Sequence, residues 1–351
     1  MSDEIPFHLQ EQIIKRLPVI SLLQFRSVSK AWKSVIDNSN FIAAHSAHSV
    51  TQPQHLFLKF VHILPQSVKL LKRSSIIGSL GLLCFHGYTG EQDLETEMVV
   101  LWNPTIRKSI DVDVPNNPNP DCETEHGFGV CPVTADPKII AITQFHNTKT
   151  NYHCEAIVYA LSSGKWRSVS NNLPSKPFRV FWPHVVVERF IYWCAFDPMT
   201  MASGLPNHNQ IMSFDTTDEN FGVIDLPDSL RCRSPTLLCI SKLRESLILL
   251  EYTDFFMGSC AVWMMENGVH KSFTKLFTVK APYGSRTIRT LGFRKSGQPI
   301  MELESHDYIY EKSELVVYHP DSQRFICLAI YGTTESFVVN SYMETLVLLG
   351  Y

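Results

Sequence analysis

Residues 5–42 have the sequence IPFHLQEQIIKRLPVISLLQFRSVSKAWKSVIDNSNFI, and their apolar side chains recur at helical spacing. Leu9, Ile13 and Leu17 lie four residues apart, which places them on one face of a helix. A residue that precedes proline is disfavoured in the α region. The first helix is therefore predicted to end before Pro18.

Two further short helices are predicted after this proline. The apolar residues around Leu22 mark the second helix. Ser29 is a candidate cap for the third helix, because its hydroxyl can accept a hydrogen bond from a free N–H of the first turn. Trp32 then shares one face of this third helix with Val35 and Ile36.

Apolar residues are too frequent in this stretch for the helices to bury alone. Eighteen of the 38 residues are apolar, and three short helices cannot bury that many among themselves. The surplus must face either the rest of this chain or another protein. Periodicity does not choose between a helical cap folded onto its own β domain and a module that docks a partner.

The same stretch resembles an F-box. The matching positions are Pro6, Leu9, Ile13, Ile14, Arg16–Val19, Ser21–Leu23, Phe25, Arg26, Val28–Lys30, Trp32 and Phe41. The resemblance implies a Skp-type adaptor as partner and, through it, a cullin–RING ubiquitin ligase. It also implies which residues contact the adaptor: Pro6, Leu9, Ile13, Ile14, Leu17, Pro18, Leu22, Leu23, Phe25, Val28 and Trp32.

The charge of this stretch departs from the F-box pattern near the first helix. Phe7 and His8 occupy positions where the family usually has acidic residues, and Gln12 replaces a common Glu. Negative charge near a helix start is favourable by about 0.3–1 kcal/mol, so its loss is expected to weaken this helix or its adaptor contact. Residues 5–42 nevertheless carry a net charge of +3, which suits the acidic surface typical of Skp-type adaptors.

The composition is that of a globular protein, with 44% hydrophobic and 19% charged residues. A formal net charge of −3 gives no general footprint for nucleic acid. The nine cysteines form no C-x-x-C pair, which argues against a zinc ribbon and for free thiols in a reducing compartment. No signal-peptide pattern and no membrane-length apolar run are present, so we expect a cytoplasmic or nuclear protein with no membrane partner.

After Val50 the pattern changes to short β-strands, predicted at Leu56–Phe60, Val68–Leu71, Leu82–Phe85 and Met98–Trp102. A repeat then occurs five times: an apolar strand ends in an aromatic residue, a polar turn follows, and an apolar or aromatic residue opens the return strand. The leading aromatics are Trp102, Tyr159, Phe214, Trp263 and Tyr318, and the returns open at Ile110, Trp166, Phe221, Phe273 and Phe325. Their spacings of 57, 55, 49 and 55 residues are typical of a propeller with one four-stranded blade per repeat.

This second region resembles the plant F-box-associated domain, a family often called kelch-type. The matching motifs are Ser79–Cys84, Leu101–Thr105, Val158–Tyr159, Trp166–Arg167, Ile191–Trp193, Ser213–Asp215, Val262–Met265, Lys275 and Met343–Val347. The Gly-Gly pair of kelch repeats and the Trp-Asp dipeptide of WD repeats are absent. The chain is thus predicted to be mainly β, with a three-helix F-box at residues 1–48 and a propeller-like substrate-recognition domain at residues 49–351.

The propeller is predicted to have six blades and to close by pairing its N-terminal and C-terminal strands. Strands begin near Leu56, before the first repeat, and both Phe337–Val339 and Leu346–Leu349 are β-prone after the last repeat. An open edge leaves a row of unpaired N–H and C=O groups. We therefore expect the last strands to pair with those at residues 56–71 in a shared sixth blade.

No constellation in the sequence predicts catalysis, a metal or a cofactor. The 14 histidines fall in no ligand spacing such as H-E-x-x-H, and neither a G-x-S-x-G elbow nor a phosphate loop is present. The histidines interpreted as ordinary strand or loop residues are His62, His184, His306 and His319. The tryptophans interpreted as core, rather than as a stacking platform for sugar or nucleic acid, are Trp102, Trp166, Trp193 and Trp263.

Three loops are candidates for target recognition, because propeller loops commonly carry binding residues. These loops are Val114–Glu125, Phe196–Gln210 and Asp254–Met257. The candidate target-binding residues within them are Asp121, Glu123, Met199, Met201, Phe255 and Phe256. An alternative for the last two is that they fill the domain interior.

These observations predict a non-catalytic substrate receptor of a Skp–cullin–F-box ubiquitin ligase. The F-box docks the adaptor, and the β domain presents an unidentified protein for ubiquitylation and proteasomal degradation. The rate gain comes from effective concentration rather than from chemistry on this chain. Two alternatives stay open: an F-box scaffold that binds its partner without ubiquitylation, and a propeller enzyme that acts on glycans, against which the missing acid/base cluster argues.

Overall fold

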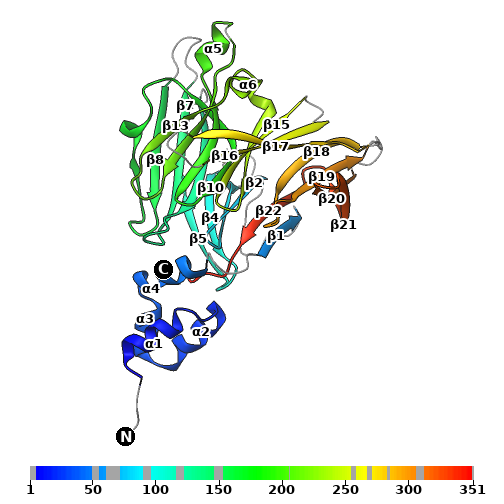
Figure 1. The fold of residues 1–351 in the computed structure, drawn as a ribbon. Coiled ribbons are helices and arrows are strands. Elements are labelled where there is room, and N and C mark those ends of the chain that lie inside the picture. The colour runs from blue at the N-terminus through cyan, green and yellow to red at the C-terminus, as the bar shows by residue number, and fades with distance from the viewer. Residues whose placement is uncertain are drawn as a thin grey trace.

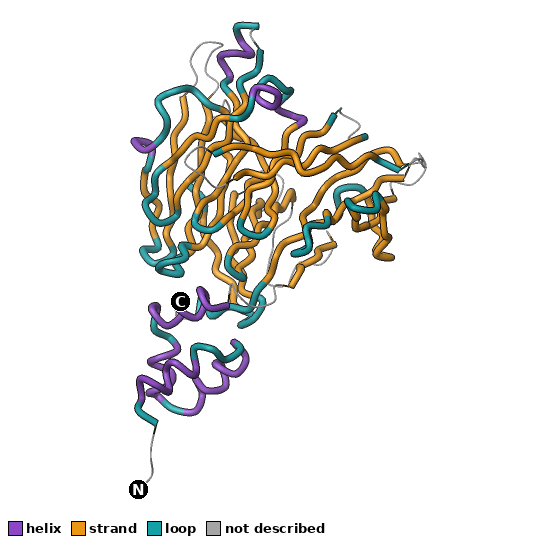
Figure 2. Tube along the Cα trace, in the orientation of Figure 1, coloured by secondary structure: helices purple, strands orange, loops and turns teal. Residues whose placement is uncertain are grey.

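The computed structural model describes residues 5–49, 55–60, 72–89, 96–115, 122–145, 153–204, 206–253, 258–266, 271–282, 285–305 and 312–349. Figure 1 shows a group of helices at one end of the molecule, next to a ring of antiparallel sheets. Figure 2 separates the two parts by secondary structure, with the N-terminal helices at one end and the strands filling the rest.

The N-terminal part contains four helices, not the three that the sequence predicts. They are α1 (Phe7–Ile14), α2 (Val19–Val28), α3 (Lys30–Ile36) and α4 (Ser39–Ser49). The first helix ends before Pro18, as predicted, and Trp32 donates its backbone N–H to the Ser29 hydroxyl at 3.2 Å, which confirms the predicted cap of α3. The additional helix α4 lacks a clear amphipathic pattern in the sequence, because its buried residues contact both the F-box and the β domain.

Five four-stranded antiparallel sheets form the blades. The first is β2 (Lys72–Ser79), β3 (Leu82–Thr89), β4 (Thr96–Asn103) and β5 (Lys108–Asp113); the second is β6 (Cys122–Val130), β7 (Pro137–Phe145), β8 (His153–Ala160) and β9 (Lys165–Ser168). The third is β10 (Arg179–Val187), β11 (Phe190–Phe196), β12 (Asn209–Asp215) and β13 (Phe221–Asp225); the fourth is β14 (Leu238–Leu243), β15 (Ser246–Tyr252), β16 (Ser259–Glu266) and β17 (Ser272–Lys280). The fifth is β18 (Ser285–Phe293), β19 (Pro299–Ser305), β20 (Lys312–His319) and β21 (Arg324–Thr333).

The five sequence repeats are the hairpins between the third and fourth strands of these blades. In three blades the leading aromatic residue lies directly opposite the aromatic residue that opens the return strand. These pairs are Tyr159 with Trp166, Phe214 with Phe221, and Tyr318 with Phe325, with ring centroids 5.4, 4.9 and 5.0 Å apart. Cross-strand aromatic pairs stabilise a hairpin, so the repeat has a packing cause as well as a period.

The predicted pairing of the chain's two ends is confirmed. β1 (His55–Phe60) pairs antiparallel with β22 (Phe337–Tyr342), in a register that places His55 opposite Tyr342. β22 contacts both the first and the fifth blades: the Asn340 side chain accepts from Gly78 N at 3.2 Å, and Arg289 donates to Phe337 O at 3.4 Å. The inner strands β2, β6, β10, β14, β18 and β22 thereby follow one another around the ring.

The prediction of six full blades is wrong in strand content. The position between the fifth and first blades holds, within the described residues, a two-stranded sheet. Only five hairpin repeats exist to supply third and fourth strands, and the two chain ends supply one strand each. The predicted strand at Leu346–Leu349 is also wrong, because this segment forms a turn packed into a hydrophobic cluster. The predicted strand Val68–Leu71 lies outside the described residues.

The hydrophobic core is divided among the interfaces between neighbouring blades. One cluster joins the second and third blades around the fully buried Trp193 and Phe214, and similar clusters join the third to the fourth and the fourth to the fifth. Trp102, Trp166 and Trp263 pack, half-buried, against such clusters, so the interpretation of the four tryptophans as core is confirmed. Among the described residues, no helix is long and apolar enough to cross a membrane.

Candidate functional site

The F-box has a small interior of its own. Ile14 from α1, Val19 and Leu22 from α2, and Ile36 from α3 are each less than 5% exposed. Ile14 and Leu22 were among the residues predicted to contact an adaptor. Their burial means that they hold the helices together and are not presented to a partner in this conformation.

The apolar residues that the F-box leaves in solvent form the strongest candidate binding surface. Seven large apolar side chains here are between 37% and 71% exposed: Ile5, Phe7, Leu9, Ile13, Ile20, Phe25 and Val28. We call these seven residues the F-box outer face. Exposed apolar groups in such number mark an interaction site, because burying them against a partner releases water from apolar surface.

An aromatic cluster organises part of the F-box outer face. The Phe7 ring stacks on Trp32 with centroids 5.5 Å apart, and Phe25 meets the same indole edge-on at 6.1 Å. Trp32 is half-buried and fixes both phenylalanines, which remain accessible. Partly exposed aromatic side chains held in one geometry are typical of binding hot spots.

The outcome for the remaining predicted contacts is mixed. Leu9, Ile13, Phe25 and Val28 belong to the F-box outer face, Pro6 and Pro18 are exposed, and Leu17, Leu23 and Trp32 are half-buried. The sequence interpretation missed Ile5, Phe7 and Ile20. For Phe7 the signal was present: an aromatic residue at a position where an acidic residue is usual had to pack on something, and it packs on Trp32.

Basic side chains surround this face. Lys15 pairs with Glu11 at 3.0 Å, and Arg26 holds Asp37 through two hydrogen bonds of 2.5 and 2.9 Å, which links α2 to the end of α3. Arg16, Lys30 and Lys33 are exposed and form no ion pair with another described residue. The free charge around the outer face is therefore positive and favours an acidic partner.

The F-box is fixed to the propeller by α4 and by the C-terminal segment after β22. The Ser46 hydroxyl in α4 lies 3.4 Å from the Thr345 hydroxyl. The Asn103 side chain at the end of β4 donates to Thr345 O at 3.0 Å and to Val347 O at 2.6 Å. Leu346 and Val347 are buried in the hydrophobic cluster that also contains the F-box interior, so one continuous core spans the junction.

His45 in α4 is the titratable group of this junction. Its Nε2 donates to Leu17 O at 3.0 Å and so ties α4 to the end of the first helix. Burial lowers the pKa of His45; the bond to Leu17 and the carboxylate of Glu344 oppose this shift, and His48 adds to it. A neutral His45 is therefore part of the folded junction.

The residues predicted for target binding are only partly described. Those outside the described residues are Asp121, Phe255 and Phe256. Glu123 is exposed at the start of β6 and forms an ion pair of 2.5 Å with Arg179, at the start of β10. Met199, which is half-buried, and Met201 belong to α5 (Pro198–Ala202).

These target-side elements lie together, far from the F-box. Arg179 pairs in register with Phe196, the last residue of β11, and the chain continues from there into α5. Figure 1 places α5 and the nearby α6 (Asp228–Arg231) at the end of the propeller opposite to the F-box helices. The molecule thus presents the F-box outer face and the α5 side of the propeller in opposite directions.

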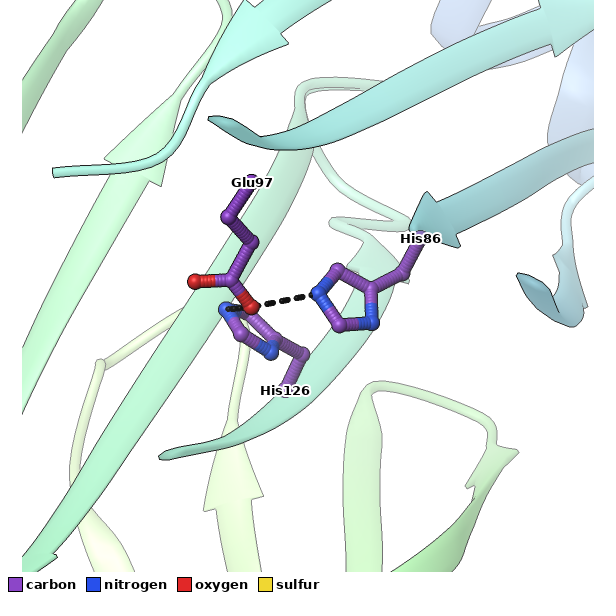
Figure 3. A group of neighbouring side chains, drawn as sticks. All are labelled: His86, Glu97 and His126. Carbon is purple, nitrogen blue, oxygen red and sulfur yellow. Dashed lines mark hydrogen bonds and ion pairs between the residues drawn. The ribbon is translucent and has the colours of Figure 1, made fainter. Parts of the chain in front are cut away.

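A third group of polar residues lies inside the propeller. His86 from β3, Glu97 from β4 and His126 from β6 point toward one another (Figure 3), and one ligand atom of each lies within 4.8 Å of the others. His86 Nε2 donates to Glu97 Oε1 at 2.6 Å, and His126 Nε2 lies 3.7 Å from the same oxygen. Burial lowers the pKa of His126 to about 3, and the nearby His86 lowers it further, so this imidazole is neutral.

Comparison with known proteins places the two parts in known classes. The helical module and the propeller define an F-box protein of the propeller class, and residues 3–43 match the F-box domain. Residues 27–347 match the F-box associated beta propeller domain, and the chain belongs to this family.

Its relatives include many proteins of Arabidopsis thaliana. The chain is 23% identical to the F-box protein CPR1, over 98% of this chain and 89% of that protein, and 24% identical to the F-box/kelch-repeat protein At3g23880, over 98% and 95%. It is 28% identical to the F-box protein At2g21930, but there the match spans 64% of this chain and only 60% of the relative. The β-propeller domain of the Trilobed protease from Pyrococcus furiosus has a TM-score of 0.38, with 13% identity over 73% of this chain and 72% of that one, which carries no argument about function.

Proposed function

We propose that this protein is the substrate-recognition subunit of a Skp–cullin–F-box ubiquitin ligase. The F-box outer face binds a Skp-type adaptor, and the propeller captures a protein target for ubiquitylation and proteasomal degradation. The chain itself performs no chemistry in this proposal. The observation that carries the proposal is the F-box outer face, whose seven apolar side chains stay in solvent although one continuous core joins the F-box to the propeller.

The basic surroundings of this face support the choice of partner. Arg16, Lys30 and Lys33 carry charge that no described residue neutralises, and an acidic adaptor would complement it. Electrostatic complementarity of this kind raises association rates and disfavours partners of the wrong charge. The adaptor contact that we propose therefore combines an apolar centre with a basic rim.

The fixed junction supports a receptor role. A ligase receptor works by raising the effective concentration of its target near the ubiquitin-charged enzyme, and a rigid connection keeps that concentration high. The contacts of Asn103 with Thr345 and Val347 connect the propeller to the segment on which α4 rests. The target-binding surface that we propose includes Glu123, Met199 and Met201 on the side away from the F-box.

We further propose that residues 1–48 act as the adaptor module and residues 49–351 as the target-binding module. All nine cysteines are free thiols in the structure, which supports a role in the reducing cytosol or nucleus. No metal or cofactor is needed for this function.

The test is reconstitution with a Skp-type adaptor, a cullin and a RING subunit. A chain lacking residues 1–48 should act as a trap that captures the target without ubiquitylating it, and mass spectrometry of the captured proteins should identify a candidate. The intact complex should then ubiquitylate that candidate. Capture without ubiquitylation by the intact complex would support a scaffold instead, and failure to bind the adaptor would refute the proposal.

A further inference from the structure

The polar group inside the propeller lies where the first blade faces the second. His86 and Glu97 are on the neighbouring strands β3 and β4 of the first blade, and His126 is on β6, the inner strand of the second blade. The rings of His86 and His126 lie close, with centroids 4.1 Å apart and planes inclined by 31°. Figure 3 shows the carboxylate of Glu97 directed at both rings.

His126 lacks the hydrogen bonds that a buried imidazole normally has. Its side chain is 8% exposed, and within the described residues neither ring nitrogen has a hydrogen-bond partner. The separation of 3.7 Å from Glu97 is too long for such a bond. Buried polar groups in native proteins are satisfied by protein, water or an ion, so the orphaned nitrogens indicate that something occupies this space.

A second unsatisfied histidine faces the same space. His184 on β10 accepts the backbone N–H of Phe128 through Nε2 at 2.9 Å, so the proton of its neutral ring lies on Nδ1. That Nδ1 is buried and has no partner among the described residues. His86, His126 and His184 line one small cavity, and the rest of its wall is mainly apolar, with Ile77 and Phe128 as examples.

We propose that His86, Glu97 and His126 bind a Zn²⁺ ion that joins the first blade of the propeller to the second. Two imidazole nitrogens and one carboxylate oxygen are a donor set that zinc commonly takes. Zinc–ligand bonds of about 2.0–2.2 Å in a tetrahedron place ligand atoms roughly 3.4 Å apart. The separations of 2.6 and 3.7 Å around Glu97 Oε1 bracket that value, so binding requires movements of less than about 1 Å.

The metal takes the place of a proton in this arrangement. The proton that His86 Nε2 donates to Glu97 leaves on zinc binding, because a ligating nitrogen needs its lone pair. A single carboxylate and two neutral imidazoles give the site a charge of −1, which the ion converts to +1. The fourth position is open for a water molecule, and the Nδ1–H of His184 offers that water a hydrogen bond.

The proposal makes zinc a structural link between blades. Binding to the folded propeller alone stabilises it, because an unfolded chain does not bring residues of two blades together. We therefore expect zinc to raise the melting temperature and to rigidify the contact between β3, β4 and β6. This role is independent of adaptor binding and of the identity of the target.

The experiment uses the full chain in complex with its adaptor, with any polyhistidine tag removed and metal stripped by a chelator. Zinc titration against a chromogenic chelator should give one ion per chain with submicromolar affinity. His126→Gln should weaken binding by roughly 100-fold or more, since it removes a ligand rather than an outer-shell partner. The matched control is His153→Gln, an exposed histidine in β8 that also lies beside a carboxylate, at 3.4 Å from Glu155.

X-ray absorption of the zinc-loaded wild type provides a readout that needs no variant. The proposal expects a shell of nitrogen and oxygen at about 2.0–2.1 Å and no sulfur at about 2.3 Å. A sulfur shell would assign the zinc to cysteines and overturn the proposal. So would the absence of stoichiometric binding, which would leave a water bridging the orphaned nitrogens, or equal binding by His126→Gln and His153→Gln. Glu97→Gln, which keeps the side-chain volume, gives the same test should the His126 variant fail to fold.

Discussion

Replacing Leu9 and Ile13 together with alanine should weaken adaptor binding and leave the fold intact. Both side chains lie on α1, four residues apart, and are 46% and 53% exposed. The exposed half of each side chain is the part that a partner can bury. The buried half contributes to the folded state mainly near the backbone, where alanine retains it.

The magnitude follows from these exposures. Full burial of a leucine or isoleucine side chain contributes about 1.5–3 kcal/mol, so half of it contributes about 0.7–1.5 kcal/mol. Two side chains give about 1.5–3 kcal/mol, which corresponds to a dissociation constant roughly 10- to 150-fold larger. The corresponding double aspartate variant should bind more weakly still, because an unpaired carboxylate would be buried in the interface.

The assay is isothermal titration or surface plasmon resonance with a purified Skp-type adaptor, accompanied by thermal unfolding of each variant. Gln12→Ala is the matched control, because Gln12 is an exposed polar residue of the same helix. It should bind as the wild type does. Leu17 is a poorer choice for this test, because it is half-buried against the F-box core. Equal affinity of the double alanine variant and the control would refute the assignment of this face to the adaptor.

Three further predictions concern the junction and the target side. Asn103→Ala should lower the free energy of unfolding by about 1–3 kcal/mol, because two carbonyls lose their donor at the junction; an unchanged denaturation midpoint would contradict this. His45→Gln should reduce the loss of stability on acidification from about pH 7.5 to 5.5, because a histidine whose folded pKa lies below its unfolded value of 6.5 contributes stability above that value and loses it as the pH falls; equal pH slopes for variant and wild type would argue against it. Replacing residues 199–204 with a short Gly/Ser link should shift the melting temperature little and remove target capture, since this segment buries little apolar area; capture of the same proteins would place the target site elsewhere.

Local patterning accounts for the parts of the fold that were predicted correctly. Each leading aromatic residue of the repeat has a partner a few residues later in the same hairpin, as Phe214 has in Phe221, so sequence spacing alone reveals the unit. Five such hairpins gave five blades. The pairing of β1 with β22 followed from counting strands left without a partner, an argument about backbone hydrogen bonds that does not depend on side chains.

Burial on both sides of a helix accounts for the failures. Ile14 and Leu22 fit the F-box pattern as well as Leu9 does, and a pattern does not say which of them faces inward. Leu346 belongs to an apolar run that reads as a strand, but its neighbours across the junction come from α4 and from the first blade, more than 240 residues away in sequence.

The histidine cluster was missed for a related reason. Residues 86, 97 and 126 are separated by 11 and 29 positions, which matches no local ligand motif. Only the packing of β6 against the first blade brings the third residue to the other two. Reasoning from spacing finds sites within one supersecondary unit and does not find sites that two blades share.

The closure by β1 and β22 has a consequence for how the chain is made. β1 is complete when Phe60 is synthesised, and its partner strand begins at Phe337, 277 residues later. At translation rates of about 5–20 residues per second, β1 remains an unpaired edge for roughly 15–60 s. During this interval the F-box helices are already outside the ribosome, but the C-terminal segment on which α4 rests does not yet exist. Nascent chains thus expose both the adaptor-binding surface and an aggregation-prone strand, and a chain whose synthesis stops before residue 337 can never close its ring.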